Sequence, residues 1–497
     1  MVSKEYPRIG EKIYHAELPN GLHIYVDRRP EFQKSYAFFA TNYGGMDMKF
    51  RLDGQWRDTP AGVAHFLEHK MFDTEDGNAL QDLAANGASP NAFTSSALTG
   101  YYFESTEKFC DNLKILLSFV SIPWFTQESV DKEQGIIGQE IRMVEDDPDN
   151  QVFYGLMECL FDHHPIRVPI AGTQESISHI TADTLYACHK AFYTPSNMVL
   201  TVAGDVEPEE VVRIAREILP KEPGGHIERD YGGEEDGGAA APEKELRMEV
   251  STPIFQLGFK AEPAPAGEEH LRRQLMGELA CEALLGNSSP LYARLYSEGL
   301  INKNFGYGFE LYPGCALMAA GGESRDPRAV RDAVLAEGAR IAREGVDEGL
   351  FRRLKKGVYG AKVRGLNSFE NVCIELAQAH FAGVEYLTFP EVFDGISKAD
   401  VEDCIRRWVT PERCGLAVVR PGGGGMMGTV SFPGLGLEFH LNRVAFHIGS
   451  WPVYWYGIII AAGFLLAVLY CCHAAKRFGI KQDDIIDMLF LPCPCPS

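Results

Sequence analysis

The sequence predicts an α+β fold made of two like domains, followed by one C-terminal transmembrane helix. Three observations support this prediction: an internal repeat, a polar glycine-rich segment between its two copies, and a long uncharged run near the end. The chain has 497 residues, which is too long for one ordinary hydrophobic core. We therefore expect domains at 1–220 and 246–425, a flexible linker at 221–245 and a membrane tail at 426–497.

The internal repeat supports two like domains. A helix-forming stretch ends at Thr194-Pro195 and leads into an apolar strand. About 215 residues later the same order recurs around Thr410-Pro411. Between the copies, residues 221–245 are rich in Gly, Glu and Asp and cannot bury much apolar surface, which is typical of a linker.

The first domain is expected to combine strands with helices. Residues 18–26 predict a turn that leads into a strand, and further β-prone runs predict strands at 35–41, 91–95 and 100–105. Apolar residues at helical spacing predict a helix over 107–120, which ends before Pro123. Thr126 is a good N-cap for a long helix over 127–145.

The stretch His65-Phe66-Leu67-Glu68-His69 is the strongest functional motif. Residues four apart on a helix share one face, so His65 and His69 can point at one ion, and Glu68 leans toward the same space. Two imidazoles beside a carboxylate in the order H-x-x-E-H are typical of zinc hydrolases. The alternative is a pair of histidines on the polar face of a helix, in which case the pattern arises by chance.

The helix predicted at 127–145 supplies candidates for a third zinc ligand. Glu133 and Glu140 are nearly two helical turns apart, so their carboxylates share one face. We predict Glu140 as the third ligand and Glu133 as a catalytic-site group that orients a ligand or the water. Position alone leaves other acids of this helix open, including Glu128 and Glu145.

The H-x-x-E-H motif, with Glu133 and Glu140 downstream, resembles the M16 metallopeptidases, the family of pitrilysin, insulysin and the mitochondrial processing peptidase. The likeness extends over about residues 10–425 and is strongest to bacterial members. It implies two homologous domains, each an antiparallel β-sheet packed with helices. It also implies that Zn²⁺ is held by His65, His69 and Glu140, with Glu68 as the general base.

The resemblance further implies where a peptide substrate binds. The family's substrate-binding edge strand has its counterpart in Asn91-Ala92-Phe93-Thr94. Many members also carry an Arg in the second half, and a Tyr seven residues later, to hold substrate near the metal. Here Tyr296 stands at the Arg position and Tyr307 is the candidate partner. A paired subunit could supply the missing groups, so we expect a homodimer or a heterodimer with a related M16 subunit.

The second domain lacks the metal motif. Its matching helix region, 268–286, contains only His270 among histidines. The resemblance therefore implies a non-catalytic half that closes over the substrate, so that the two halves form a clamshell.

Charge and composition argue against other classes of protein. The net charge is −22 and no basic stripe runs along the main body, so nucleic-acid binding is not expected. The N-terminus has no apolar core typical of a secretory signal. The cysteines form no C-x-x-C pair, as expected for free thiols in a reducing compartment. We expect a cytoplasmic body.

The tail after Met426 has a different character. The uncharged run at 449–472 exceeds the roughly 20 residues needed to span a bilayer and predicts an inner-membrane anchor; a buried core helix is the alternative. Segments 442–446 and 454–458 resemble the N-terminus of prolipoprotein diacylglyceryl transferase, of which only the first membrane helix is present. We hypothesise a fusion of two reading frames at 425–427, with the second cut short.

The sequence thus predicts a zinc-dependent endopeptidase that hydrolyses peptides. Two alternatives stay open. One is a non-catalytic or partner-dependent M16 subunit with a binding role, which the departure at Tyr296 favours. The other is lipoprotein lipid transfer, which rests on the tail alone and for which the later catalytic helices of that family are absent.

Overall fold

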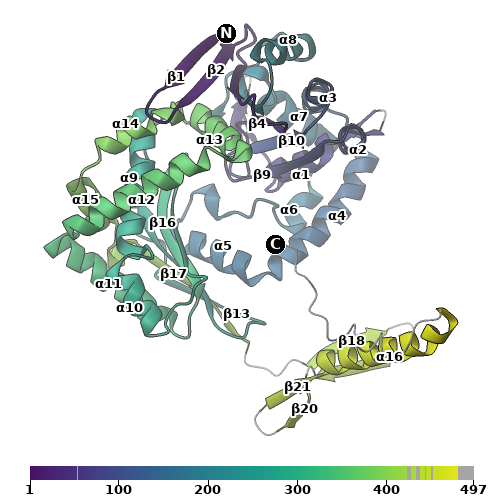
Figure 1. Ribbon diagram of the computed structural model, residues 1–497, viewed down its shortest axis with the longest axis vertical. Helices are drawn as coiled ribbons and strands as arrows, with labels where there is room; N and C mark the ends of the chain where they lie inside the picture. Colours follow the sequence, from purple (N-terminus) through teal and green to yellow (C-terminus); the bar gives the residue numbers. More distant parts are fainter. Residues whose placement is uncertain are drawn as a thin grey trace. The chain divides into compact units, whose positions relative to one another are not determined.

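The computed structural model describes residues 1–52, 54–75, 77–422, 427–432, 437–442, 444–448 and 451–478. The chain divides into two compact units, 1–421 and 422–497. The first unit contains two large sheets with helices packed on them (Figure 1).

The first half of the large unit is built around a seven-stranded sheet. Its strands are β1 (Val2–Tyr6), β2 (Glu11–Glu17), β3 (His23–Arg28), β4 (Ser35–Thr41), β9 (Ser89–Thr94), β10 (Thr99–Ser105) and β11 (Met198–Gly204). Their order in the sheet is β1-β2-β3-β11-β4-β10-β9. Neighbours are antiparallel except β3 and β11, which are parallel. Strand β9 lies at the edge of this sheet.

The second half repeats five of these strands. They are β13 (Glu243–Met248), β14 (Ile254–Ala261), β15 (Gly306–Tyr312), β16 (Cys315–Glu323) and β17 (Cys414–Pro421). The order β13-β17-β14-β16-β15 matches β3-β11-β4-β10-β9, and the pair β13–β17 is again parallel. The predicted α+β class and the two like domains are confirmed. The parallel pair in each mostly antiparallel sheet arises because the last strand returns, after a helix, to the middle of the sheet.

Helices cover both sheets. In the first half they are α1 (Val63–Met71), α2 (Ala79–Ala85), α3 (Phe109–Ser121), α4 (Gln127–Glu145), α5 (Pro148–Leu160), α6 (Gln174–Ser178), α7 (Ala182–Phe192) and α8 (Pro208–Ile218). In the second half they are α9 (Glu268–Leu285), α10 (Pro290–Ser297), α11 (Pro327–Glu344), α12 (Glu348–Gly365), α13 (Phe369–Phe381), α14 (Phe389–Asp394) and α15 (Lys398–Trp408). The large unit also contains five short strands: β5 (Lys49–Leu52), β6 (Gln55–Asp58), β7 (Asp73–Thr74), β8 (Gly77–Asn78) and β12 (Glu228–Arg229).

Each half lends one helix to the sheet of the other half. Helix α5 packs on β13, β14 and β17, where a Cβ at Gly258 would lie 2.9 Å from Leu160 Cδ1. Helix α13 packs on β4 and β11, and Thr201 Oγ1 donates a hydrogen bond to the carbonyl oxygen of Cys373 at 3.0 Å. Because both exchanged helices are buried in mixed clusters, the two halves form one unit.

The segment expected to be a flexible linker makes specific contacts at Glu235. Its carboxylate accepts hydrogen bonds from the backbone N–H groups of Asp162, His163 and His164, at 3.1, 2.6 and 2.7 Å. It also pairs with the buried Lys260 Nζ on β14 at 2.7 Å. Burial alone would raise the pKa of Glu235, but Lys260 and the three donors lower it to about 2. The proposed domain boundaries stay predictions.

The second unit ends, within its described residues, in α16 (Trp455–Phe478). It is preceded by two hairpins, β18 (Met427–Phe432) with β19 (Leu437–Asn442) and β20 (Val444–Ile448) with β21 (Trp451–Tyr454). The stretch Trp455–Ala475 is long and apolar enough to cross a membrane, and little of it is buried by other parts of the chain. Only the length and composition of this helix support its assignment as a membrane span. Residues 449–450 of the predicted anchor lie outside the described residues.

Replacing Glu235 by Gln tests how strongly this carboxylate ties the segment to both halves. We expect Glu235→Gln to lower the free energy of unfolding by about 1–3 kcal/mol at pH 7, since an amide cannot neutralise the buried Lys260. The folded-state pKa lies below the ordinary 4.5, so this stabilisation is present above pH 4.5 and is lost as the pH falls toward 2. Urea denaturation at several pH values measures it.

The exposed neighbour Glu234 provides the matched control. Glu234→Gln removes the same charge and should change stability by less than about 0.5 kcal/mol. Equal stability of Glu235→Gln and the wild type at pH 7 would contradict the assigned contacts.

Candidate metal centre

Helix α1 presents the H-x-x-E-H motif because its opposite face is buried. Phe66 and Leu67 are fully buried in the first hydrophobic core. Their packing turns His65 and His69 to the same side, where the ring centroids lie 4.6 Å apart. The spacing seen in the sequence therefore becomes a pair of convergent imidazoles.

The start of α1 is fixed by a close approach of two backbone segments. Gly62 has φ +97° and Gly172 has φ +74°, conformations that favour glycine. A Cβ at Gly62 would lie 2.6 Å from the Ala171 carbonyl oxygen, and one at Gly172 would lie 2.4 Å from that of Ala61. Ser176 Oγ also donates to the Ala61 carbonyl oxygen at 2.8 Å. These contacts set the position of the motif helix.

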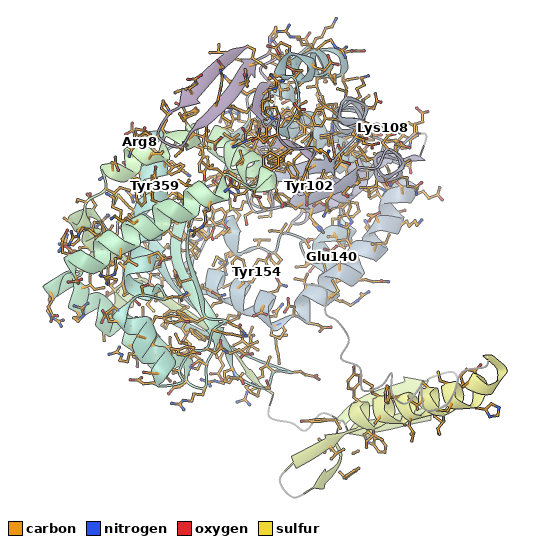
Figure 2. All side chains as sticks on the ribbon, in the orientation of Figure 1. Arg8, Tyr102, Lys108, Glu140, Tyr154 and Tyr359 are labelled. Atoms are coloured by element: carbon orange, nitrogen blue, oxygen red, sulfur yellow. The ribbon has the colours of Figure 1, made fainter. Side chains whose placement is uncertain are left out.

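Helix α4 brings the two glutamates to α1. Thr126 and Ser129 form a capping box that begins the helix at the predicted residue. One face of α4 is buried through Val130, Ile137, Gly138 and Ile141. Glu133 and Glu140 approach α1 from this helix, and Glu140 lies in its C-terminal half (Figure 2).

The structure brings His65, His69 and Glu140 together. Glu140 Oε1 lies 3.5 Å from His65 Nε2, and Glu140 Oε2 lies 3.5 Å from His69 Nε2. One ligand atom from each residue lies within 4.8 Å of the others. Among the described residues, this is the one group of three such side chains that could hold a metal ion.

The donor set fits zinc. Two imidazole nitrogens and a carboxylate oxygen are ordinary zinc ligands, and three protein ligands are typical of catalytic rather than structural sites. Ligand atoms about 2.1 Å from a tetrahedral ion lie about 3.4 Å apart, close to the 3.5 Å between each histidine Nε2 and the Glu140 oxygen that faces it. The hydrogen bond to His65 lowers the pKa of Glu140, which keeps it a carboxylate.

Glu133 contacts the far side of the His69 ring. Its Oε1 lies 3.1 Å from His69 Nδ1, while Nε2 of the same ring faces Glu140. Burial would lower the pKa of His69, but the bond to Glu133 and the charges of Glu68 and Glu140 raise it. The same bond lowers the pKa of Glu133. With Nδ1–H donated to Glu133, the Nε2 lone pair is available to the cluster.

Glu68 lies between the cluster and the edge strand β9. It is buried, and its Oε2 accepts a hydrogen bond from Thr94 Oγ1 at 2.7 Å. Thr94 is the last residue of β9, so the predicted strand residues Asn91, Ala92 and Phe93 lead directly to Glu68. Within the described part of the chain, β9 has a strand partner on one side only, β10.

The two tyrosines predicted to hold substrate lie in the second half. Tyr296, on α10, is 53% exposed and stacks on Tyr292 with centroids 6.0 Å apart. Tyr307, on β15, donates its hydroxyl to Glu282 Oε1 at 3.1 Å. Neither has a described contact with α1, α4 or β9. Their role in binding substrate stays a prediction.

The matching helices of the second half carry an ion pair instead of a metal cluster. Helices α9 and α12 follow β14 and β16 as α1 and α4 follow β4 and β10. Glu278 and Glu282 have the i, i+4 spacing of His65 and His69, and Lys362 Nζ on α12 lies 3.0 Å from Glu278 Oε1. A protonated lysine here neutralises a carboxylate that could otherwise bind a cation, which supports a non-catalytic second half.

Comparison with known proteins identifies the family. Residues 54–174 match the model of the insulinase peptidases (family M16), and residues 179–358 match the M16 inactive domain. A Bacillus subtilis protein named uncharacterized zinc protease YmfH is 38% identical over 427 residues, covering 84% of this chain and 98% of that protein. The chain belongs to the M16 peptidase family. The predicted resemblance is therefore confirmed.

Solved structures agree with this M16 assignment. An M16-like peptidase from Alicyclobacillus acidocaldarius has a TM-score of 0.80 at 31% identity, covering 85% of this chain and 100% of that one. A protease from Helicobacter pylori, at 17% identity, has the same fold with a TM-score of 0.70, over 83% of this chain and 100% of that one. Residues 443–495 match the model of prolipoprotein diacylglyceryl transferase, as the tail sequence predicted.

Zinc affinity distinguishes the roles of the glutamates on α4. We expect Glu140→Gln to weaken zinc binding by more than about 100-fold because it removes a ligand, and Glu133→Gln by about 10–100-fold because it removes only a partner of one. Competition with a chromogenic chelator measures both. Glu128→Gln, exposed on the first turn of the same helix, is the control and should bind zinc as the wild type does. Full affinity in Glu140→Gln would refute the ligand assignment.

Proposed function

We propose that this M16 chain is a zinc-dependent endopeptidase. The observation that supports this most strongly is the convergence of His65, His69 and Glu140 beside the buried Glu68, at the end of an edge strand. His65 Nε2, His69 Nε2 and a Glu140 oxygen would hold the ion. Zinc, when bound, supplies Lewis acidity that activates water at neutral pH and polarises a carbonyl.

Glu68 is proposed as the general base. Thr94 donates to its Oε2, which fixes the carboxylate and leaves Oε1 to act on a proton. Glu68 would take a proton from the attacking water and then pass it to the leaving amine. Its position one residue before His69 keeps it beside the cluster without making it a ligand.

The substrate is proposed to be a peptide that adds as a strand to β9. The outer side of β9 has no strand partner among the described residues, so its backbone groups can bind an extended chain. Main-chain hydrogen bonds along Asn91-Ala92-Phe93-Thr94 would then deliver the scissile bond next to Glu68. This binding mode selects unfolded segments, because a folded substrate cannot present a free strand.

We propose that the clamshell that encloses the substrate forms between this chain and a partner chain. The exchange of α5 and α13 opposes opening between the two halves of one chain, since their separation would expose both buried helices. We propose that closure occurs between this chain and a second M16 subunit, identical or related. The exposed Tyr296 belongs to the half that would then meet substrate or partner.

We propose that the tail determines where the protein is located in the cell and takes no part in catalysis. The body would work in the cytoplasm, with membrane contact only through α16. The origin of the tail in a fusion of two reading frames stays a hypothesis, which the intact mass of the native protein tests.

Substitution of the base tests the chemistry directly. We expect Glu68→Gln to reduce peptide turnover by at least about 100-fold, because the amide cannot accept the proton, while one zinc per chain stays bound. Cleavage of an unfolded-peptide library and metal analysis of the same sample measure the two effects. Turnover equal to the wild type would refute the base assignment.

Removal of the tail tests its relation to the site. We expect a chain of residues 1–421, a compact unit in the structure, to keep the zinc content and peptide turnover of the full chain. Loss of zinc on this truncation would contradict the separation of the two units.

The rival function is a binding role in which the metal stabilises the fold and a partner performs the chemistry. The observation that favours it is the absence of contact between Tyr296 or Tyr307 and the cluster among described residues. Stoichiometric zinc with no cleavage of any peptide, alone or with a related M16 subunit, would support this rival.

A further inference from the structure

A buried lysine lies directly behind the candidate metal ligands. Lys70 follows His69 on α1 and is only 2% exposed. Successive side chains on a helix diverge, so Lys70 points away from the ring of His69 rather than into the cluster. A lysine ammonium in such a position is costly unless carboxylates face it.

Two carboxylates face Lys70. Asp73, three residues later, forms an ion pair with Nζ, and Glu133 Oε2 lies 3.9 Å from it. Asp73 is 38% exposed, whereas Glu133 is 17% exposed. Water can replace Lys70 as a partner for Asp73 more easily than for Glu133, so the contact with Glu133 depends more on the lysine.

The two oxygens of Glu133 link Lys70 to the metal ligand. Oε2 faces the Lys70 ammonium, and Oε1 lies 3.1 Å from His69 Nδ1. With both oxygens engaged, the carboxylate cannot rotate without losing one of these partners. His65 has no such support, because its Nδ1 is buried without a hydrogen-bond partner in the described part of the structure. Of the two histidines, His69 is therefore the one whose ring is oriented by a hydrogen bond at Nδ1.

We propose that Lys70 is a positioning residue that orients the metal ligand His69 through Glu133. The inference rests on the proposed function, in which His69 holds zinc. Lys70 touches neither metal nor substrate. Its contribution is to hold the Glu133 carboxylate in the orientation that accepts Nδ1–H of His69 and leaves Nε2 directed at the site.

Zinc affinity of the full chain tests the proposal independently of peptidase activity. Lys70→Met keeps an unbranched apolar stem and removes the charge; we expect zinc affinity to fall about tenfold or more. Glu133→Gln and the double variant complete a cycle. In the Glu133→Gln background, Lys70→Met should change the affinity by no more than about twofold, because its route to His69 is already broken.

Lys260→Met is the matched control. Lys260 is the other buried lysine of the described residues, it pairs with Glu235, and it lies outside the cluster. Its substitution should lower the thermal midpoint of the zinc-free chain and leave zinc affinity within about twofold of the wild type. This separates a general loss of stability from a change at the site.

Wild-type zinc affinity in folded Lys70→Met, or an undiminished effect of Lys70→Met in the Glu133→Gln background, would overturn the inference alone. A wild-type chain that binds no zinc would overturn the proposed function and this inference together. If Lys70→Met does not fold, Lys70→Arg and Lys70→Gln replace it. We expect Lys70→Arg to retain the zinc affinity of the wild type and Lys70→Gln to lose about tenfold. Equal zinc affinities of these two variants would overturn the proposal.

Discussion

The hydrogen bond between His69 Nδ1 and Glu133 Oε1 is the interaction on which the site depends. It joins helices α1 and α4 through residues 64 positions apart in the chain. The same docking of α4 places Glu140 3.5 Å from both histidines, so a shift of this helix would remove a ligand and the support of another together. The buried face of α4 sets the position of this helix, and the crossing of the backbone at Gly62 and Gly172 sets the position of α1.

The fold could be predicted where local pattern decides it. Thr126 correctly predicted the start of α4. The Thr-Pro pairs at 194–195 and 410–411 predicted a repeated helix followed by a strand, which the structure shows as α7–β11 and α15–β17. The exchange of α5 and α13 could not be predicted. An amphipathic helix shows that it has a buried face, but not which sheet covers that face. The parallel pairs β3–β11 and β13–β17 are likewise set by tertiary return of the chain.

The candidate site divides in the same way. Helical spacing predicts that His65 and His69 share one face of α1 and that Glu133 and Glu140 share one face of α4. The docking of α4 on α1, which brings the two pairs together, was implied by the family resemblance and not by spacing. The bond from Thr94 to Glu68 and the enclosure of Lys70 depend on contacts between separate elements, so spacing alone could not reveal them. The available signal that Lys70 has a structural partner was the presence of a charged residue at a buried position of α1. Tyr296 and Tyr307 rested on family analogy, and their described contacts stay within the second half.

The proposed function requires one zinc ion in the first half and none in the ion-paired counterpart of the second. A crystal structure of the zinc-loaded chain, with anomalous diffraction recorded on both sides of the zinc absorption edge, measures this most directly. We expect a single peak about 2.1 Å from His65 Nε2, His69 Nε2 and a Glu140 oxygen. A peak elsewhere, such as between Glu278 and Glu282, or no peak from a chain that retains this fold, would contradict it.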